Sequence, residues 1–288
     1  MKGYHCVWEA PRTLPYMQWE ILLQILSARF WKEAYGQIGL VCDESTLEYY
    51  QSIGMDEIYD EIEILDRDLL EGIDPNIYFA AGKVAAMLQI QGDKIAFIDT
   101  DLLIAEFPQP FDLDTVTVFH REALTDYVYP DFFDKWKTEE EVDNECMALN
   151  CALVVWPQEE LRRNYAATSL KFMRANDYHG RLLKNVLMVT AEQRMLGIFL
   201  KNRGIIPDYI VKDIYIPTFT DTSISWYSDG LGSNLKEMSE KFVHVWGHKD
   251  LLRKDPMEAA QYTIQLFQLC EKYPELNVES ILSKMINQ

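Results

Sequence analysis

Cysteine is scarce in this 288-residue sequence: there are five, and no two of them form a Cys-x-x-Cys pair. The sequence therefore lacks the paired thiols of common structural zinc sites, and an odd number does not suit a disulfide framework. Three of the five lie in apolar runs that have the character of strands. We expect buried, reduced thiols in a cytoplasmic protein. The five are Cys6, Cys42, Cys146, Cys151 and Cys270.

Long hydrophobic runs are also lacking. None approaches the roughly eighteen apolar residues that a membrane-spanning helix needs. The longest candidate, residues 19–31, is interrupted by Glu20 and Arg29. The first eleven residues contain no apolar segment of the kind found in secretory signal peptides. We therefore expect no transmembrane segment, which agrees with a cytoplasmic location.

Basic residues are in the minority. The chain has 27 Lys and Arg against 46 Asp and Glu, which gives a net charge of −19 and a pI of about 4.6. Such a surface repels phosphate backbones and anionic lipid headgroups, so nucleic acid is not an expected partner. An anionic small ligand would need a local cation or a metal. The acidic clusters at 56–74 and 138–145 are expected to be solvated.

Apolar residues, by contrast, make up 48% of the chain, enough for a sizeable core. Apolar runs of strand length alternate with runs of helical spacing, which predicts a mostly parallel sheet with helices on both faces. No linker is evident, so residues 1–288 are expected to form one α/β domain, with C-terminal helices at 256–272 and 278–286 packed on it. The predicted strands are 4–8, 38–42, 61–65, 94–98, 115–120 and 147–156. The predicted helices are 16–34, 45–54, 79–92, 157–176 and 191–204. Thr190 and Gln193 have the spacing of a capping box for the last of these helices.

Two aspartates close the apolar strand in "KIAFIDTDLLI", residues 94–104. Ligands of such sheets bind at the carboxyl ends of strands, which is where Asp99 and Asp101 fall. In an extended segment their side chains point the same way, and two unpaired carboxylates there would resist ionisation. A divalent cation removes that penalty. The alternative is a pair of solvated acids at a strand end.

Histidine is the other scarce type, with five in the chain. The segment "FVHVWGHKDLLR", residues 242–253, concentrates His244, Gly247, His248, Lys249 and Arg253. A glycine lets backbone approach a phosphate, and the two basic side chains would neutralise it. In a chain this acidic, the cluster suggests an anion site. An imidazole added to two carboxylates favours manganese over magnesium.

Four stretches together resemble a known family: "FAAGKVAAMLQIQGDKIAFIDTDLLI", "ALNCALVVW", "TAEQRMLG" and "FVHVWGHK". They are similar, in order and spacing, to the GT-A nucleotide-sugar glycosyltransferases, nearest to family-eight-like enzymes and their bacterial relatives. Two departures bear on the substrate. Cys151 and Ala152 stand where Ala and Gly usually follow the asparagine, and the last stretch lacks the usual Lys-Pro-Trp ending.

The resemblance implies a GT-A fold and a metal-dependent hexosyltransferase with a UDP-sugar as the expected donor and an unknown acceptor. Polysaccharide biosynthesis is an association of the family. The resemblance places Mn²⁺ (or Mg²⁺) on Asp99, Asp101 and His244, with Glu192 and Gln193 at the reacting carbon. Either the reaction retains configuration and Gln193 lies at the β face of the sugar, or it inverts and Glu192 acts as the base. Donor-binding positions would be Lys83, Asp99, Asn150, Trp246, Gly247 and Lys249.

Local explanations stay open for several of these residues. Asn150 would bond a neighbouring turn, Glu192 would be a helix N-terminal acid, Gln193 would complete the capping box, and Trp246 would simply pack. Two other functions also stay open. One is a non-catalytic nucleotide-sugar-binding domain. The other is a phosphatase of the haloacid-dehalogenase kind, in which Asp99 would be the nucleophile.

Overall fold

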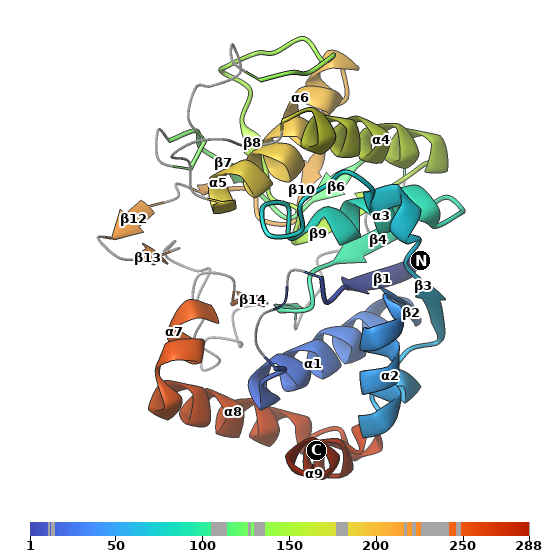
Figure 1. Cartoon of the computed structure of the whole chain (residues 1–288), viewed down its shortest axis with the longest axis vertical. Coiled ribbons are helices and arrows are strands. Elements are labelled where there is room, and N and C mark those ends of the chain that lie inside the picture. Colours follow the sequence, from blue (N-terminus) through green and yellow to red (C-terminus); the bar gives the residue numbers. More distant parts are fainter. Residues whose placement is uncertain are drawn as a thin grey trace.

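A seven-stranded sheet with the order β10-β6-β9-β4-β1-β2-β3 organises the molecule, as the computed structural model in Figure 1 shows. The structure describes residues 1–10, 12, 15–104, 114–125, 128–129, 136–176, 184–215, 218–220, 223–225, 242–245 and 249–287. The strands of this sheet are β1 (Lys2–Val7), β2 (Gln37–Cys42), β3 (Glu61–Ile64), β4 (Ile95–Ile98), β6 (Thr117–Val118), β9 (Leu153–Trp156) and β10 (Asp208–Tyr209). All pair in parallel except β9, which runs against both β4 and β6. The predicted mostly parallel sheet is confirmed.

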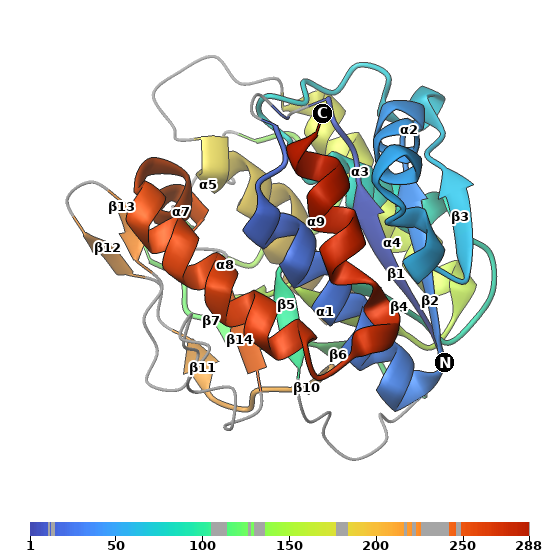
Figure 2. The ribbon, with the colours of Figure 1, turned by 90° about the horizontal axis from the view of Figure 1, so that it is seen from below.

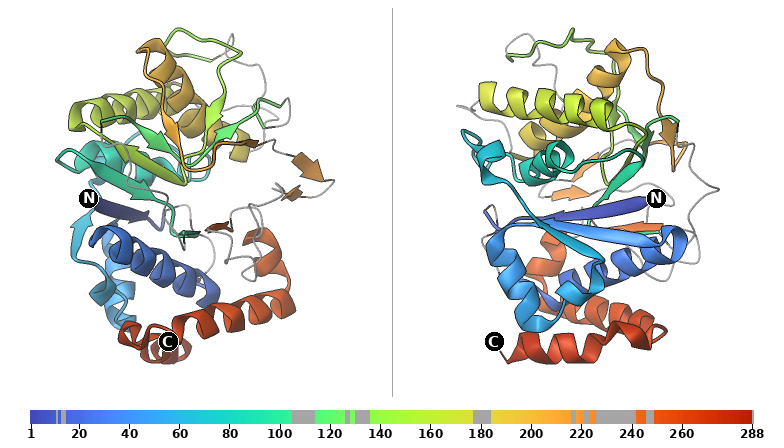
Figure 3. Two further views of the ribbon diagram at one scale, coloured as in Figure 1. Left: turned by 180° about the vertical axis from the view of Figure 1, so that it is seen from behind. Right: turned by 90° about the vertical axis from the view of Figure 1, so that its right-hand side faces the viewer.

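Helices cover both faces of the sheet, as predicted (Figure 3). One face packs against α1 (Gln18–Tyr35), α2 (Glu44–Ile53), α8 (Pro256–Cys270) and α9 (Val278–Ile286), which Figure 2 shows from below. The other face packs against α3 (Ala81–Gln89), α4 (Glu159–Ala175), α5 (Lys184–Val189) and α6 (Met195–Asn202). Successive strand residues supply the two cores alternately: Leu40 faces the first set of helices and Val41 the second. The two C-terminal helices lie where they were predicted.

Short strands beyond the main sheet bring distant segments to its edge. β5 (Leu102–Ile104) pairs antiparallel with β14 (Phe242–His244), and α7 (Lys249–Lys254) follows. A second small sheet has the order β11-β7-β8, formed by β11 (Ile214–Tyr215), β7 (Arg121–Glu122) and β8 (Ala148–Leu149). β12 (Thr218–Thr220) pairs with β13 (Ser223–Ser225). The one-turn helices are η1 (Asp56–Ile58), η2 (Arg67–Leu70) and η7 (Pro274–Leu276).

Two predicted strands are interrupted where they leave the main sheet. Of residues 115–120, only 117–118 pair in it, and the chain then enters the small sheet at β7. Residues 147–156 divide into β8 and β9 around Asn150, whose own backbone bonds His120 and Phe119. A continuous apolar run does not reveal such a change of sheet, because both strands are buried and leave the same pattern.

The predicted helix at 191–204 begins earlier than expected, and the capping box is wrong. Residues 184–189 are already helical, and residues Thr190–Arg194 form a π-helical segment, η4, between α5 and α6. Thr190 is thus interior to the helix and caps nothing, and the Gln193 side chain bonds a tyrosine instead. A π segment widens the turn and often marks a functional site.

The prediction of reduced cysteines is confirmed. All five are free, and four of them are buried, while Cys6 is partly buried. Burial raises the pKa of the Cys42 thiol to about 12, so the neutral form is strongly favoured. In the part of the chain that the structure describes, no helix combines the length and apolar character needed to cross a membrane.

Candidate functional site

The two aspartates of the strand end lie in a turn. Asp99 follows β4 directly, its N–H donates to the Ala152 carbonyl (2.7 Å), and its carbonyl accepts from the Leu102 N–H (3.1 Å). The expectation that both side chains would project from extended backbone is therefore wrong. The turn, closed by that hydrogen bond, leads into β5 and still brings the two carboxylates together.

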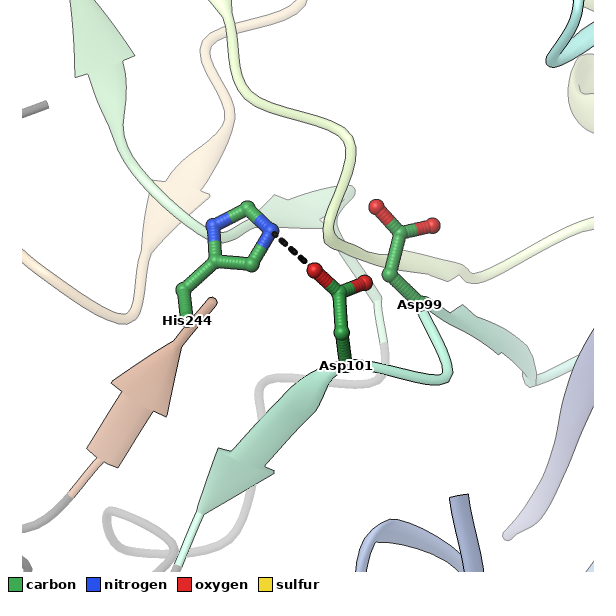
Figure 4. Close-up of side chains that lie close together, drawn as sticks. All are labelled: Asp99, Asp101 and His244. Carbon is green, nitrogen blue, oxygen red and sulfur yellow. Dashed lines mark ion pairs between the residues drawn. The ribbon is translucent and has the colours of Figure 1, made fainter. Parts of the chain in front are cut away.

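His244 reaches the aspartates through the pairing of β14 with β5, which sets His244 opposite Leu102, next to Asp101. Figure 4 shows the imidazole and the Asp101 carboxylate facing each other, with Asp99 beside them. One ligand atom from each of the three lies within 4.8 Å of the others. The predicted trio of Asp99, Asp101 and His244 therefore comes together from segments more than a hundred residues apart.

The charge states of this trio suit a divalent cation. Burial opposes ionisation of Asp101, which is 4% exposed, but the ammonium of Lys249 favours the carboxylate, and the pKa of Asp101 is lowered. Burial lowers the pKa of His244, so its imidazole is neutral and has a lone pair to donate. Asp101 Oδ2 and His244 Nε2, which lie 3.8 Å apart, are both buried, and neither has a hydrogen-bond partner among the residues that the structure describes. Two carboxylates and one neutral imidazole form an oxygen-rich set that fits Mn²⁺ or Mg²⁺.

Lys249 also approaches Asp101, with its Nζ 2.9 Å from Oδ2. The two atoms are close enough for an ion pair, but their angles do not make a hydrogen bond, and Oδ2 accepts none from the described residues. A cation bound between the carboxylates would compete with this ammonium for the same oxygen. The predicted donor-binding lysine thus lies at the trio, at the first residue of α7.

Lys83, the second predicted lysine, is a buried cation between two carboxylates. It is 8% exposed, and its Nζ lies 2.7 Å from Asp99 Oδ1, 2.7 Å from Glu192 Oε1 and 3.0 Å from the Cys151 carbonyl. Burial alone would lower the pKa of Lys83, but Asp99 and Glu192 outweigh it and raise the pKa. Burial raises the pKa of Glu192, and Lys83 offsets part of that rise. Lys83 therefore ties the aspartates to the helical segment that carries Glu192.

Glu192 and Gln193 both lie in the π segment. The interpretation of Glu192 as a helix N-terminal acid is wrong, because a full turn of helix precedes it. Gln193 Oε1 contacts the Tyr129 hydroxyl. That hydroxyl also lies 2.6 Å from Glu122 Oε2, which connects the π segment to β7.

Asn150 has both a local bond and a site contact. Its Oδ1 accepts from the Ala152 N–H (2.9 Å), which is the turn bond expected locally. Its Nδ2 donates to Glu122 Oε1 (2.6 Å). Burial raises the pKa of Glu122 to about 7, although hydrogen bonds from Tyr129 and Asn150 oppose the rise.

Glu122 is the residue that the sequence reasoning missed. It is an acid just beyond an apolar strand, in "TVTVFHRE", and this is the same signal that singled out Asp99. Of the other predicted residues, Trp246 and Gly247 lie outside the described residues, as does His248.

The comparisons with known proteins come from structure alone, since no family model and no curated protein matches the chain. The galactosyltransferase LgtC, in complex with donor and acceptor sugar analogs, is similar with a TM-score of 0.40 and 8% identity over 66% of this chain and 70% of that chain. Mouse xyloside xylosyltransferase 1 has a TM-score of 0.38 and 11% identity over 73% and 85%. The inositol-1-phosphate CTP transferase from T. maritima has a TM-score of 0.35 and 11% identity over 75% and 84%. A function for this chain has to be argued from its own side chains.

Proposed function

We propose that this chain is a metal-dependent glycosyltransferase that moves a sugar from a UDP-sugar to an acceptor hydroxyl. The observation that carries the proposal is the convergence of Asp99, Asp101 and His244. Two of their buried ligand atoms lack a hydrogen-bond partner in the part of the chain that the structure describes. Lys83 and Lys249 stand at the same point. In a chain with a net charge of −19, two lysines placed at a carboxylate pair favour a ligand such as a diphosphate.

The roles follow from the positions. Asp99, Asp101 and His244 would hold Mn²⁺ or Mg²⁺, and that ion would supply positive charge for the leaving nucleoside diphosphate. Lys249 contacts the same carboxylate and would share the charge of the donor phosphates. Lys83 holds Asp99 and Glu192 at a fixed distance. Asn150 and Trp246 remain proposed donor contacts, together with Gly247.

The stereochemical course depends on which side chain of the π segment meets the reacting carbon. In an inverting reaction Glu192 would accept the proton of the acceptor hydroxyl, and burial raises the pKa of its carboxyl, which strengthens it as a base. In a retaining reaction Gln193 would face the donor sugar and no such base is required. Analysis of the product anomer distinguishes the two.

The first experiment is thermal unfolding with UDP, GDP or CMP, each with and without Mn²⁺. We expect stabilisation that requires one nucleotide and Mn²⁺ together; a ligand at about 100 times its dissociation constant adds roughly 2.7 kcal/mol. Asp101→Asn keeps the shape of the side chain but removes its charge and should abolish the shift. Glu57→Gln is the matched control. Glu57 is exposed in η1, which precedes β3, so it lies at the amino end of a parallel strand, whereas the aspartates lie at the carboxyl end of β4.

The outcomes separate the competing functions. No shift with any nucleotide in the unsubstituted protein rejects the donor site. A Mn²⁺-dependent shift without turnover of the UDP-sugar identifies a non-catalytic nucleotide-sugar-binding domain. Release of phosphate from a phosphomonoester, lost in Asp99→Asn, would instead identify the phosphatase chemistry.

A further inference from the structure

Three buried side chains form a line of oxygens that leads to Gln193 of the proposed sugar site. The other two, Glu122 and Tyr129, have no role in the proposed reaction. Glu122 is 0% exposed, Tyr129 is 2% exposed and Gln193 is 9% exposed. The Tyr129 hydroxyl lies between the other two, in contact with Glu122 Oε2 and with Gln193 Oε1. Buried polar groups need partners, so the protons along this line can be counted.

One end of the line has a fixed orientation. Asn150 Oδ1 faces the backbone N–H of Ala152, which can only donate, so the oxygen of the amide must be on that side. Asn150 Nδ2 therefore faces Glu122 Oε1 and donates to it. Oε1 is thus the acceptor oxygen of Glu122, and any proton on this carboxyl sits on Oε2, facing Tyr129.

The hydroxyl of Tyr129 has one proton and cannot donate to both neighbours. If Glu122 is ionised, Tyr129 donates to it, and the Gln193 amide must turn so that its Nε2 donates to the tyrosine oxygen. If Glu122 is protonated, its Oε2–H donates to Tyr129, and Tyr129 donates to Gln193 Oε1. The observed contact of Gln193 Oε1 with Tyr129 corresponds to the protonated form, and an amide flip corresponds to the other.

The groups around Glu122 favour the protonated form. His120 Nδ1 lies 3.2 Å from the Arg121 carbonyl and must donate to it, so the neutral ring turns the lone pair of Nε2 toward Glu122 Oε1, 4.0 Å away. Burial lowers the pKa of His120 to about 3, so it supplies no positive charge. The nearby Glu192 raises the pKa of Glu122 further. The other titratable groups that act on Glu122 in the described residues are the hydroxyl of Tyr129 and the thiol of Cys151.

We propose that Glu122, acting through Tyr129, is the positioning residue that sets the orientation of the Gln193 carboxamide. While Glu122 carries its proton, Gln193 turns its oxygen to Tyr129 and its NH₂ group away from it. When that proton leaves to solvent, the hydroxyl of Tyr129 reverses and the amide turns over. The meaning of this for a donor sugar rests on the proposed function, but the coupling itself does not.

The experiment is an NMR titration of the ligand-free, metal-free protein with ¹³C-carboxyl glutamate and ¹⁵N-side-chain glutamine. Loss of a signal in Glu122→Gln and in Gln193→Met assigns the two groups. We expect the Glu122 signal to titrate near pH 7. Exposed glutamates, with ordinary pKa values of about 4.5, are already ionised at that pH. The Gln193 amide signal should shift at the same midpoint.

Two variants test the direction of the coupling. Gln at position 122 donates to Tyr129 at every pH, as the protonated acid does, so Glu122→Gln should abolish the shift of the Gln193 signal. Tyr129→Phe removes the hydroxyl that contacts both side chains, so the Gln193 amide signal should no longer shift when Glu122 titrates. A Glu122 signal that titrates with the exposed glutamates overturns the proposal, as does a Gln193 signal that stays constant through the Glu122 midpoint. Neither outcome depends on nucleotide binding. The coupling of Glu122 to Gln193 can therefore be rejected without rejecting the proposed glycosyltransferase activity, and the reverse.

Discussion

Glu122→Gln should change how the stability of the protein depends on pH. The folded protein raises the pKa of Glu122 from its ordinary 4.5 to about 7, because the carboxyl is fully buried. Between these two pH values the folded state holds a proton that the unfolded chain has released. The free energy of unfolding therefore falls as the pH rises through this window.

The size of the effect follows from the two values. At about 1.4 kcal/mol per pH unit for one proton, the interval from 4.5 to about 7 corresponds to roughly 3 kcal/mol. This stability is fully present below pH 4.5, is lost progressively up to about pH 7 and stays lost above it. Glutamine at the same position cannot ionise, so the variant lacks this part of the pH dependence.

Urea denaturation at a series of pH values measures the difference. All other titrating groups are common to both proteins, so the free energy of unfolding of the original protein minus that of the variant isolates Glu122. We expect this difference to decrease with pH by roughly 3 kcal/mol. Glu57→Gln makes the same substitution at an exposed position and is the control. A difference that is flat for Glu122→Gln, or that increases with pH, would refute the reasoning, because it would mean an ionised carboxylate in the fold.

Other predictions concern the remaining buried contacts. Lys83→Met should reduce the free energy of unfolding by about 3–5 kcal/mol in urea denaturation, because two carboxylates lose their shared cation. Adding Glu192→Gln to this variant should recover part of the lost free energy of unfolding. Lys171→Met, in an exposed ion pair, should cost at most about 1 kcal/mol. Equal losses at the two lysines would contradict the role of Lys83 as the shared cation of Asp99 and Glu192. Gly197→Ala should cost about 1–3 kcal/mol in the same assay, since its Cβ would lie 2.3 Å from the Met147 carbonyl oxygen, and an unchanged midpoint would show that this contact relaxes freely.

Several elements could be predicted because their signals are local. The parallel strands are short apolar runs, and their alternation with helices is enough to indicate an α/β sheet. Gly54 ends α2 in a left-handed conformation, and Asp43 caps its first turn, both readable from neighbouring residues. The aspartates at the end of β4 also stood out, because ligands of such sheets bind at the carboxyl ends of strands.

The incorrect predictions around the helix at 191–204 also have local causes. Thr190 and Gln193 match a capping box in spacing, but a cap forms only where a helix begins, and α5 already extends the helix upstream. Residues 184–189 are not predicted as helix because they are mostly apolar and too short a run to show the helical period. The same error gave Glu192 a dipole explanation that its interior position removes.

What the sequence alone determined is the alternation of strands and helices and the first half of the site, since periodicity and strand-end acids are properties of short stretches. Only the tertiary structure determined which side chains of the site contact one another. His244 meets Asp101 only because β14 pairs with β5, and Lys83 meets Glu192 only because α3 and the π segment pack on the same face of the sheet. The link from Glu122 through Tyr129 to Gln193 is likewise invisible in the chain order. These contacts join residues far apart in sequence, and their charge states depend on burial, which no local pattern records.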